Sequence, residues 1–350
     1  MTDGTTTAES LSVEGLRSAL HCPRRYELAH VHGIEDDEED AVGDRVALLR
    51  TAICDALRSG ETDREELETV ARDRLSTLWT DHEEPFHSRA QRRHERRVLE
   101  ATLAAYVERV GGEHAGGIER LAADATRDEL IGPELPLSST LELPEPAGGA
   151  DPDSERETVT IDATVDYVYD DGSSIVGVRF VPTLAPLGPL RYRSEWEGDV
   201  AERFTDHFDT DSDTFEPDPV GSLFETAVVL DGLRTRRDRL ELGDRTCRYV
   251  QIPLADRSGT AVNWVRETVE TNLEVVDLTD VYVDHHTYGM THDHRNGTVD
   301  DRLGRVASGL LSGPFDPSDR WDRIAEHACP TCDYTVCCQD YIAGEVRFDG

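Results

Sequence analysis

Cysteines at the two ends of the chain constrain the fold more than any other feature. Four of the seven cysteines lie in segment 327–341, and a fifth, Cys22, lies near the other end. Three of the C-terminal four follow the spacing Cys-x2-Cys-x5-Cys: Cys329, Cys332 and Cys338. Cys337 is an alternative to Cys338. Four thiolates can hold an iron–sulfur cluster or a tetrahedral zinc ion. We therefore predict one metal site that ties the first helix to the last segment.

The cellular compartment of a protein affects what its cysteines are expected to do. Residues 1–11 are polar and acidic, so we expect no secretory signal and a cytoplasmic location. Thiols in the cytoplasm indicate metal binding or catalysis more often than disulfides. Cys54 and Cys247, which stand alone in apolar runs, are instead predicted to be buried core thiols.

The charge of the chain is extreme, at −37, and all 36 basic residues are arginine. The acidic residues are spread over the whole length, as in halophilic proteins adapted to a salt-rich cytoplasm. At 1 M salt the Debye length is about 3 Å, so a local group of arginines can still meet a polyanion. No apolar run approaches ~18 residues, which predicts no membrane span.

Hydrophobic periodicity predicts an α/β protein in which helices precede a sheet. We expect a disordered tail over 1–11, a helical region over 12–128 and an α/β core over 129–350, together forming one integrated domain. Thr62 is predicted to open a helix through a capping box, and 182–215 to be irregular. The helices are predicted at 12–20, 44–57, 62–79, 88–110, 221–237, 261–273 and 318–328. The strands are predicted at 135–143, 158–169, 175–181 and 246–254, with a strand-like 274–283; the first three form an antiparallel meander.

A block of arginines begins the predicted helix 88–110. Its members stand at helical spacing with a single acid, Glu95, among them: Arg89, Arg92, Arg93, Arg96 and Arg97. Such a face suits contact with a nucleic-acid backbone. It suits equally well ion pairs with other acidic segments of the chain.

The order of these features resembles the RecB-like branch of the PD-(D/E)XK nuclease superfamily. The likeness is greatest to its iron–sulfur members, the CRISPR-associated exonucleases and AddB-type nuclease domains. It rests on a helix that starts at Ser12 and runs into Cys22-Pro-Arg-Arg-Tyr26, and on the closing cysteines. It implies a restriction-endonuclease-like core with a [4Fe–4S] cluster on Cys22, Cys329, Cys332 and Cys338. Zinc is the alternative, and Arg24 and Arg25 would touch DNA.

The resemblance also implies a catalytic site, and here the sequence departs from the family pattern. Asp166 matches the metal-binding aspartate, and Glu134 matches a family glutamate. On the next strand Gly177 replaces the second acid and Arg179 replaces the lysine. The family histidine, expected at 43–47, and the family glutamine, expected at 221–233, are both absent. We therefore expect a degenerate site, in which Arg179 could still contact a phosphate.

The predicted function is DNA binding or processing in repair or recombination, with a helicase or another repair-complex subunit as a further partner. One alternative is an active exonuclease that uses Mg²⁺ or Mn²⁺ at a rearranged site of Glu134, Asp162 and Asp166. Another is a metal-stabilised interaction subunit without a DNA role, and a redox sensor is a weaker third. A His/Asp group at 284–286 and 292–294 could bind a metal, but a polar loop explains it better.

Overall fold

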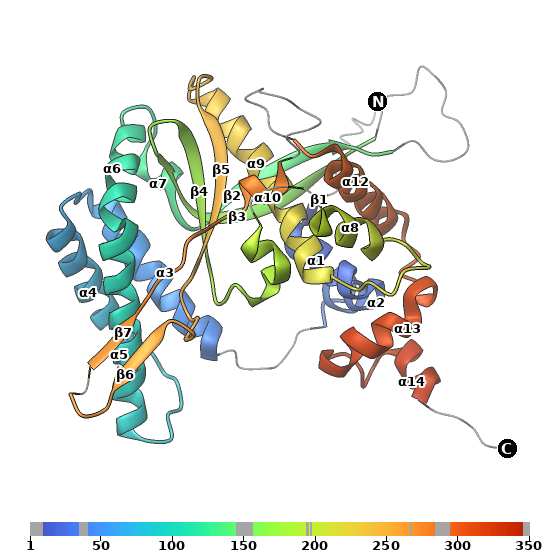
Figure 1. Cartoon of the computed structure of the whole chain (residues 1–350), viewed down its shortest axis with the longest axis horizontal. Coiled ribbons are helices and arrows are strands. Elements are labelled where there is room, and N and C mark those ends of the chain that lie inside the picture. Colours follow the sequence, from blue (N-terminus) through green and yellow to red (C-terminus); the bar gives the residue numbers. More distant parts are fainter. Residues whose placement is uncertain are drawn as a thin grey trace, which may run out of the picture.

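The computed structural model describes residues 10–34, 41–144, 157–193, 196, 198–266, 268–283 and 295–345. Within them the chain forms an α/β fold around a mixed sheet (Figure 1). The strands of this sheet follow the order β1-β3-β4-β5-β8, with β2 also paired to β3. The strands are β1 (Ser10–Ser12), β2 (Ile131–Glu142), β3 (Thr158–Asp170), β4 (Ser174–Val181), β5 (Thr246–Pro253) and β8 (Val276–Asp277).

The centre of the sheet is the predicted meander, because β2, β3 and β4 pair antiparallel in sequence order. β5 then pairs parallel to β4. A parallel neighbour requires a crossover connection, and the long helix α9 (Pro217–Arg239) supplies it. α9 carries few exposed residues because it packs between the sheet and α1 (Val13–His21).

Helices surround the sheet (Figure 1). α3 (Ala41–Ser59) confirms the predicted helix 44–57, and α5 (Arg89–Tyr106) continues through the π-helical turn η2 (Val107–Gly111) into α6 (Gly112–Leu121). The remaining α-helices are α2 (Pro23–Tyr26), α4 (Arg64–Asp81), α7 (Arg127–Leu130), α8 (Asp199–His207), α10 (Thr279–Tyr282), α12 (Gly297–Ser312), α13 (Trp321–Arg323) and α14 (Gln339–Glu345). The other helical turns are η1 (Glu27–Val31), η3 (Ala185–Tyr192), η4 (Ser318–Arg320), η5 (Ile324–Ala328) and η6 (Cys329–Thr331).

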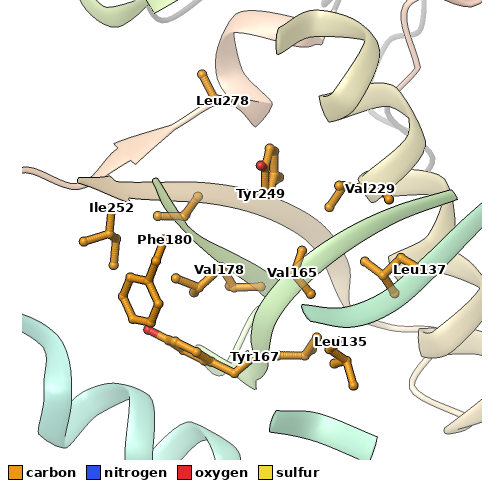
Figure 2. Close-up of a cluster of buried hydrophobic side chains, with 14 of the residues drawn as sticks. Leu135, Leu137, Val165, Tyr167, Val178, Phe180, Val229, Tyr249, Ile252 and Leu278 are labelled. Carbon is orange, nitrogen blue, oxygen red and sulfur yellow. The ribbon is translucent and has the colours of Figure 1, made fainter. Parts of the chain in front are cut away.

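One continuous core joins the helical region to the sheet, from Leu11 to Ala307. On one side of the sheet Tyr167 and Phe180 lie together (Figure 2), and Tyr106 of α5 packs edge-on against Phe180. On the other side Gly177 of β4 faces α9. A second, smaller apolar group contains Cys22 and Cys329. The segment around Cys22 therefore packs against the segment around Cys329, which lies 307 positions later in the sequence.

Two sequence predictions are wrong in the type of element. The expected helix at 261–273 is a hairpin of β6 (Thr260–Asn263) and β7 (Thr268–Thr271). This segment is rich in threonine and valine, which favour strands. The Asn263 side chain accepts the backbone N–H groups of Val265 and Arg266 and so closes the turn. The predicted tail 1–11 is also wrong at its end, because β1 adds to the sheet by pairing with β3.

Other differences are smaller. α8 forms inside 182–215, which was predicted to be irregular. Asp63, not Thr62, caps α4: its carboxylate accepts the N–H groups of Glu65 and Glu66. The strand-like segment 274–283 divides into β8 and α10, and the last predicted helix is broken into η4, α13 and η5. The run of acidic residues at 35–40 lies outside the described residues.

Candidate functional site

Asp166 lies on β3 and is completely buried. Its Oδ1 accepts a hydrogen bond from Arg50 Nε at 2.8 Å. Its Oδ2 accepts the backbone N–H of Phe180 on β4 at 2.6 Å. Both carboxylate oxygens are therefore already engaged by protein donors, whereas the family resemblance had implied a metal ligand here.

Arg50 also reaches the second predicted acid. Its Nη1 lies 3.6 Å from Glu134 Oε1, so one guanidinium bridges Glu134 and Asp166. Glu134 sits at an irregularity in the pairing of β2 with β3 and has a φ of 61°. A positive φ is strained for a residue with a side chain, and such strain is found most often at functional positions. The third predicted acid, Asp162, is exposed and has no ion pair within the described part of the chain.

Burial raises the pKa of Asp166 above its ordinary value, and the positive charge of Arg50 opposes that rise. A carboxylate in a dry site is stable only when it is paired. Arg50 supplies the pairing cation here and is itself mostly buried, with 18% of its side chain exposed. The guanidinium thus supplies the positive charge that balances this buried carboxylate.

A second buried ion pair lies next to the first. Arg179 of β4, expected to contact phosphate, instead forms a salt bridge with Glu225 of α9. Arg17 of α1 pairs with the other Glu225 oxygen at 2.5 Å. The Tyr249 hydroxyl donates to Glu225 at 2.5 Å and receives a hydrogen bond from Gln251 Nε2 at 3.0 Å.

The protonation of Glu225 follows from these partners. Burial alone would raise its pKa, but Arg179 and Arg17 lower it to about 2. Glu225 is thus a carboxylate at neutral pH although only 1% of it is exposed. The resulting network connects α1, the sheet and α9 through a single buried charge, and it holds the Arg179 side chain, of which 27% is exposed, against α9.

Gly177 explains why no second acid stands on β4. A Cβ atom placed there would lie 3.1 Å from Leu233 Cδ1 on α9 and 3.4 Å from Val165 Cγ1. The first contact is tight enough that Leu233 would have to shift by a few tenths of an ångström, whereas the second is close to an ordinary contact. The close approach of α9 to β4 thus leaves little room for a carboxylate side chain at this position.

Sequence reasoning missed Arg50, Arg17 and Glu225, although two of them carried a signal. Arg50 lies between Leu49 and Ile53 on the apolar face of α3, where a charge must find a buried partner. Glu225 interrupts the most apolar stretch of α9 in the same way. A charged residue within the apolar face of a helix is therefore the sequence signal that predicts such a buried ion pair.

The cysteines from the two ends of the chain line one small cavity. Its volume is about 20 Å³, and Trp321 and Ile324 complete its apolar wall. The four cysteines on the wall are those expected from the sequence: Cys22, Cys329, Cys332 and Cys338. Cys337 is exposed and does not line the cavity, which favours Cys338 as the fourth thiol.

Four thiols on one cavity wall supply the donor chemistry that a thiolate-bound metal requires. Burial raises the pKa of Cys22 and Cys329, so in the absence of a cation these thiols stay protonated. No group of three or more His, Cys, Asp or Glu side chains stands ready to hold a metal in the described residues. Cys54 and Cys247 are buried elsewhere, as predicted.

The predicted DNA-contacting arginines are placed in different ways. Arg24 pairs with Glu27 and Asp340, and Arg25 lies 4.0 Å from Asp333.

On α5, Arg96 pairs with Glu100 at 2.8 Å. Arg92 donates to the Trp79 carbonyl and lies over its ring, and Arg97 lines a groove beside β7. Arg89 and Arg93 are exposed and have no side-chain partner among the described residues.

The His/Asp group at 284–286 and 292–294 lies outside the described residues. None of the helices described has the length and apolar character needed to cross a membrane. No protein-family model matches the chain, and no curated protein matches it. Its function therefore has to be argued from the site itself.

Proposed function

We propose that this protein is a catalytically degenerate member of the RecB-like PD-(D/E)XK nuclease family that binds DNA in repair or recombination. Its setting would be a salt-adapted cytoplasm. The observation that carries the proposal is the bridge that Arg50 makes between Glu134 and Asp166. The family resemblance assigns Asp166 to the catalytic metal and matches Glu134 to a family glutamate, and the Arg50 guanidinium joins the two.

Metal-assisted hydrolysis needs open carboxylate oxygens to hold Mg²⁺ or Mn²⁺ and an activated water. Each Asp166 oxygen already accepts a hydrogen bond, and the positive charge of Arg50 beside it opposes a metal ion; the lysine position carries Arg179, which is tied to Glu225. An arginine is always protonated and cannot serve as a base. These ion pairs can therefore stabilise the fold, and their charges can bind a ligand. The site lacks the groups that would cut a phosphodiester.

The four-cysteine cavity belongs to the same proposal. Cys22, Cys329, Cys332 and Cys338 would hold a [4Fe–4S] cluster, with zinc as the alternative. When bound, the group would supply a covalent clamp between the first and last helices. Arg24 and Arg25 flank this cavity, so a stable clamp would also fix their positions.

One assay separates binding from cutting. Labelled single- and double-stranded oligonucleotides are incubated with the protein in Mg²⁺ or Mn²⁺, and both the bound fraction and the fragment length are measured. The proposal expects binding without cleavage. Cleavage that disappears in Asp166→Asn would instead establish an active exonuclease at a rearranged site. An equal cleavage rate in wild type and Asp166→Asn would indicate a contaminating nuclease.

A second candidate function is a metal-stabilised protein-interaction subunit without a DNA role. It is favoured by the number of predicted DNA-contacting arginines that pair within the chain, among them Arg24, Arg96 and Arg179. The absence of oligonucleotide binding at every salt concentration at which the protein is folded would support it over the first proposal.

A further inference from the structure

The turn of the β6–β7 hairpin presents large apolar side chains to solvent. Trp264 is 73% exposed and Val265 is 94% exposed. The hairpin lies along α5 at the edge of the molecule, away from the main sheet (Figure 1). The other described tryptophans are buried or half-buried. An exposed indole offers a flat aromatic face on which a ligand can stack.

The indole is held in a defined position. The His94 ring of α5 stacks against it, with ring centroids 5.1 Å apart and an interplanar angle of 28°. One face of the indole thus rests on α5. Asn263 accepts two backbone N–H groups and orders the turn that carries Trp264.

The start of the hairpin is fixed as well. Arg257, just before β6, pairs with the buried Glu95 of α5 at 2.5 Å. Arg45 of α3 pairs with the same carboxylate at 2.9 Å. The hairpin, α5 and α3 are therefore linked through one buried acid, so the exposed side chains stand on a rigid support.

Exposed arginines lie on the helix and on the turn that carry the stacked His94 and Trp264. Arg93 directly precedes His94, Arg89 lies one helical turn earlier, and Arg266 follows in the hairpin turn. All three are exposed, and none has a side-chain partner among the described residues. In a chain with 73 acidic and 36 basic residues, most arginines find an acid. Here the one acid of the helix segment, Glu95, is already taken by Arg45 and Arg257.

We propose that this hairpin surface, formed by Trp264, Arg89, Arg93 and Arg266, binds a single strand of nucleic acid. A base would stack on the exposed indole, and the arginines would contact the neighbouring phosphates. Stacking on aromatic side chains beside a positively charged track is how single strands are held without sequence preference. The inference rests on the proposed DNA-binding function and gives it a location distinct from the Asp166 site.

An acidic protein segment is the competing occupant, because it would also meet the arginines. It would leave the indole without a flat partner, whereas each nucleobase offers one. The exposed aromatic ring is thus the feature that favours nucleic acid over an acidic peptide.

The test uses the full-length protein and oligo-dT, in a KCl series over which circular dichroism shows that the protein stays folded. Trp264→Ala and the double variant Arg89→Gln/Arg93→Gln are compared with Arg305→Gln. Arg305 is an exposed arginine on α12 with no partner among the described residues, which makes it a matched control. Tryptophan fluorescence reports the stacking, with Trp264→Phe identifying the signal from this residue.

We expect Trp264→Ala to weaken oligo-dT binding roughly tenfold or more. The double arginine variant should weaken it and reduce the slope of log K against log[KCl] by about 1.4, because each phosphate contact on a single strand contributes about 0.7. Arg305→Gln should change neither. Oligo-dT should quench the fluorescence that Trp264 contributes.

Three results would overturn the inference, and they are distinguishable. Tight oligo-dT binding that is unaffected in all variants would show that the hairpin surface is not the binding site, and it would leave the proposed DNA-binding function intact. The absence of any DNA binding by the wild type would contradict both the hairpin binding site and the proposed DNA-binding function. Binding of polyglutamate, weakened by the arginine variants, without binding of oligo-dT would assign the surface to an acidic protein partner.

Discussion

Arg50 and Asp166 are 116 positions apart in the sequence, yet Arg50 Nε donates a 2.8 Å hydrogen bond to Asp166 Oδ1 in the interior of the protein. This contact connects the helical half of the chain to the sheet. It also places a permanent positive charge at the carboxylate that the family motif assigns to a metal. The energetics of this pair are therefore central to whether the site is structural or catalytic.

Removing Arg50 should destabilise the protein strongly. Arg50→Met leaves the Asp166 carboxylate buried and unpaired, and breaking a buried pair in this way costs about 3–5 kcal/mol. In the double variant Arg50→Met/Asp166→Asn the unpaired charge is gone, so part of the loss should be recovered. Urea unfolding at fixed KCl concentration measures both, with Arg305→Met as the control. Strictly additive effects would show that the two residues are not coupled.

The Glu225 network should make stability depend on acidity in a defined range. The pKa of Glu225 falls from 4.5 to about 2 in the folded protein. Its contribution is therefore fully present above pH 4.5 and is lost as the pH falls towards 2. A shift of this size corresponds to roughly 3 kcal/mol. Unfolding free energies measured across this range should fall less steeply in Glu225→Gln. Identical slopes would contradict the assigned pKa.

Gly177 should resist the acid that the family motif places there. Gly177→Ala is expected to destabilise the protein by about 1–3 kcal/mol, because the new Cβ crowds Leu233. Gly309→Ala on α12 is a useful comparison, since nothing lies within 4 Å of its Cβ position, and there the change should stabilise the helix by about 0.5–1 kcal/mol. Thermal unfolding measures both.

The bridge that Arg50 makes between Glu134 and Asp166 gives a catalytic prediction. Gly177→Glu combined with Arg179→Lys restores the family motif in letters, but we expect no metal-dependent cleavage from it. Arg50 would still occupy the space between Glu134 and Asp166. Cleavage by this variant would show that the motif, and not Arg50, limits catalysis.

The sequence predicted those parts of the fold whose signal is local. The alternation along 158–169 gave β3, and the apolar stripe of 44–57 gave α3. The hairpin at 260–271 is predicted as a helix because its apolar residues do not alternate cleanly. The strand preference of its threonines and valines is the signal that this prediction overlooks. β1 was missed because three residues carry no periodicity, and only the neighbouring strand makes them a strand.

The candidate site could be predicted only in part, for the same reason. Glu134 and Asp166 were identified by motif, and the structure brings them together, but the motif does not contain Arg50. Which charges meet across more than one hundred positions depends on how helices dock on the sheet. The pairing of Arg179 with Glu225 likewise depends on the packing of α9 against β4.

The four cysteines link the family proposal to a measurable property. Cys22 should be required for metal binding because it lines the cavity with the three C-terminal thiols, whereas Cys337 should not be required because it is exposed. Cys22→Ser and Cys337→Ser thus form a matched pair within one site. Loss of the metal should also lower thermal stability, because the clamp closes the loop between the two ends of the chain.

The most direct test of the account is anaerobic purification in high salt, followed by metal and sulfide analysis and a visible spectrum. The account predicts about four irons with acid-labile sulfide and a broad band near ~400 nm. Both should be retained in Cys337→Ser and lost in Cys22→Ser. A single zinc without colour would keep the clamp but contradict the iron–sulfur assignment. No bound metal, or equal metal content in both variants, would contradict the four-cysteine site itself.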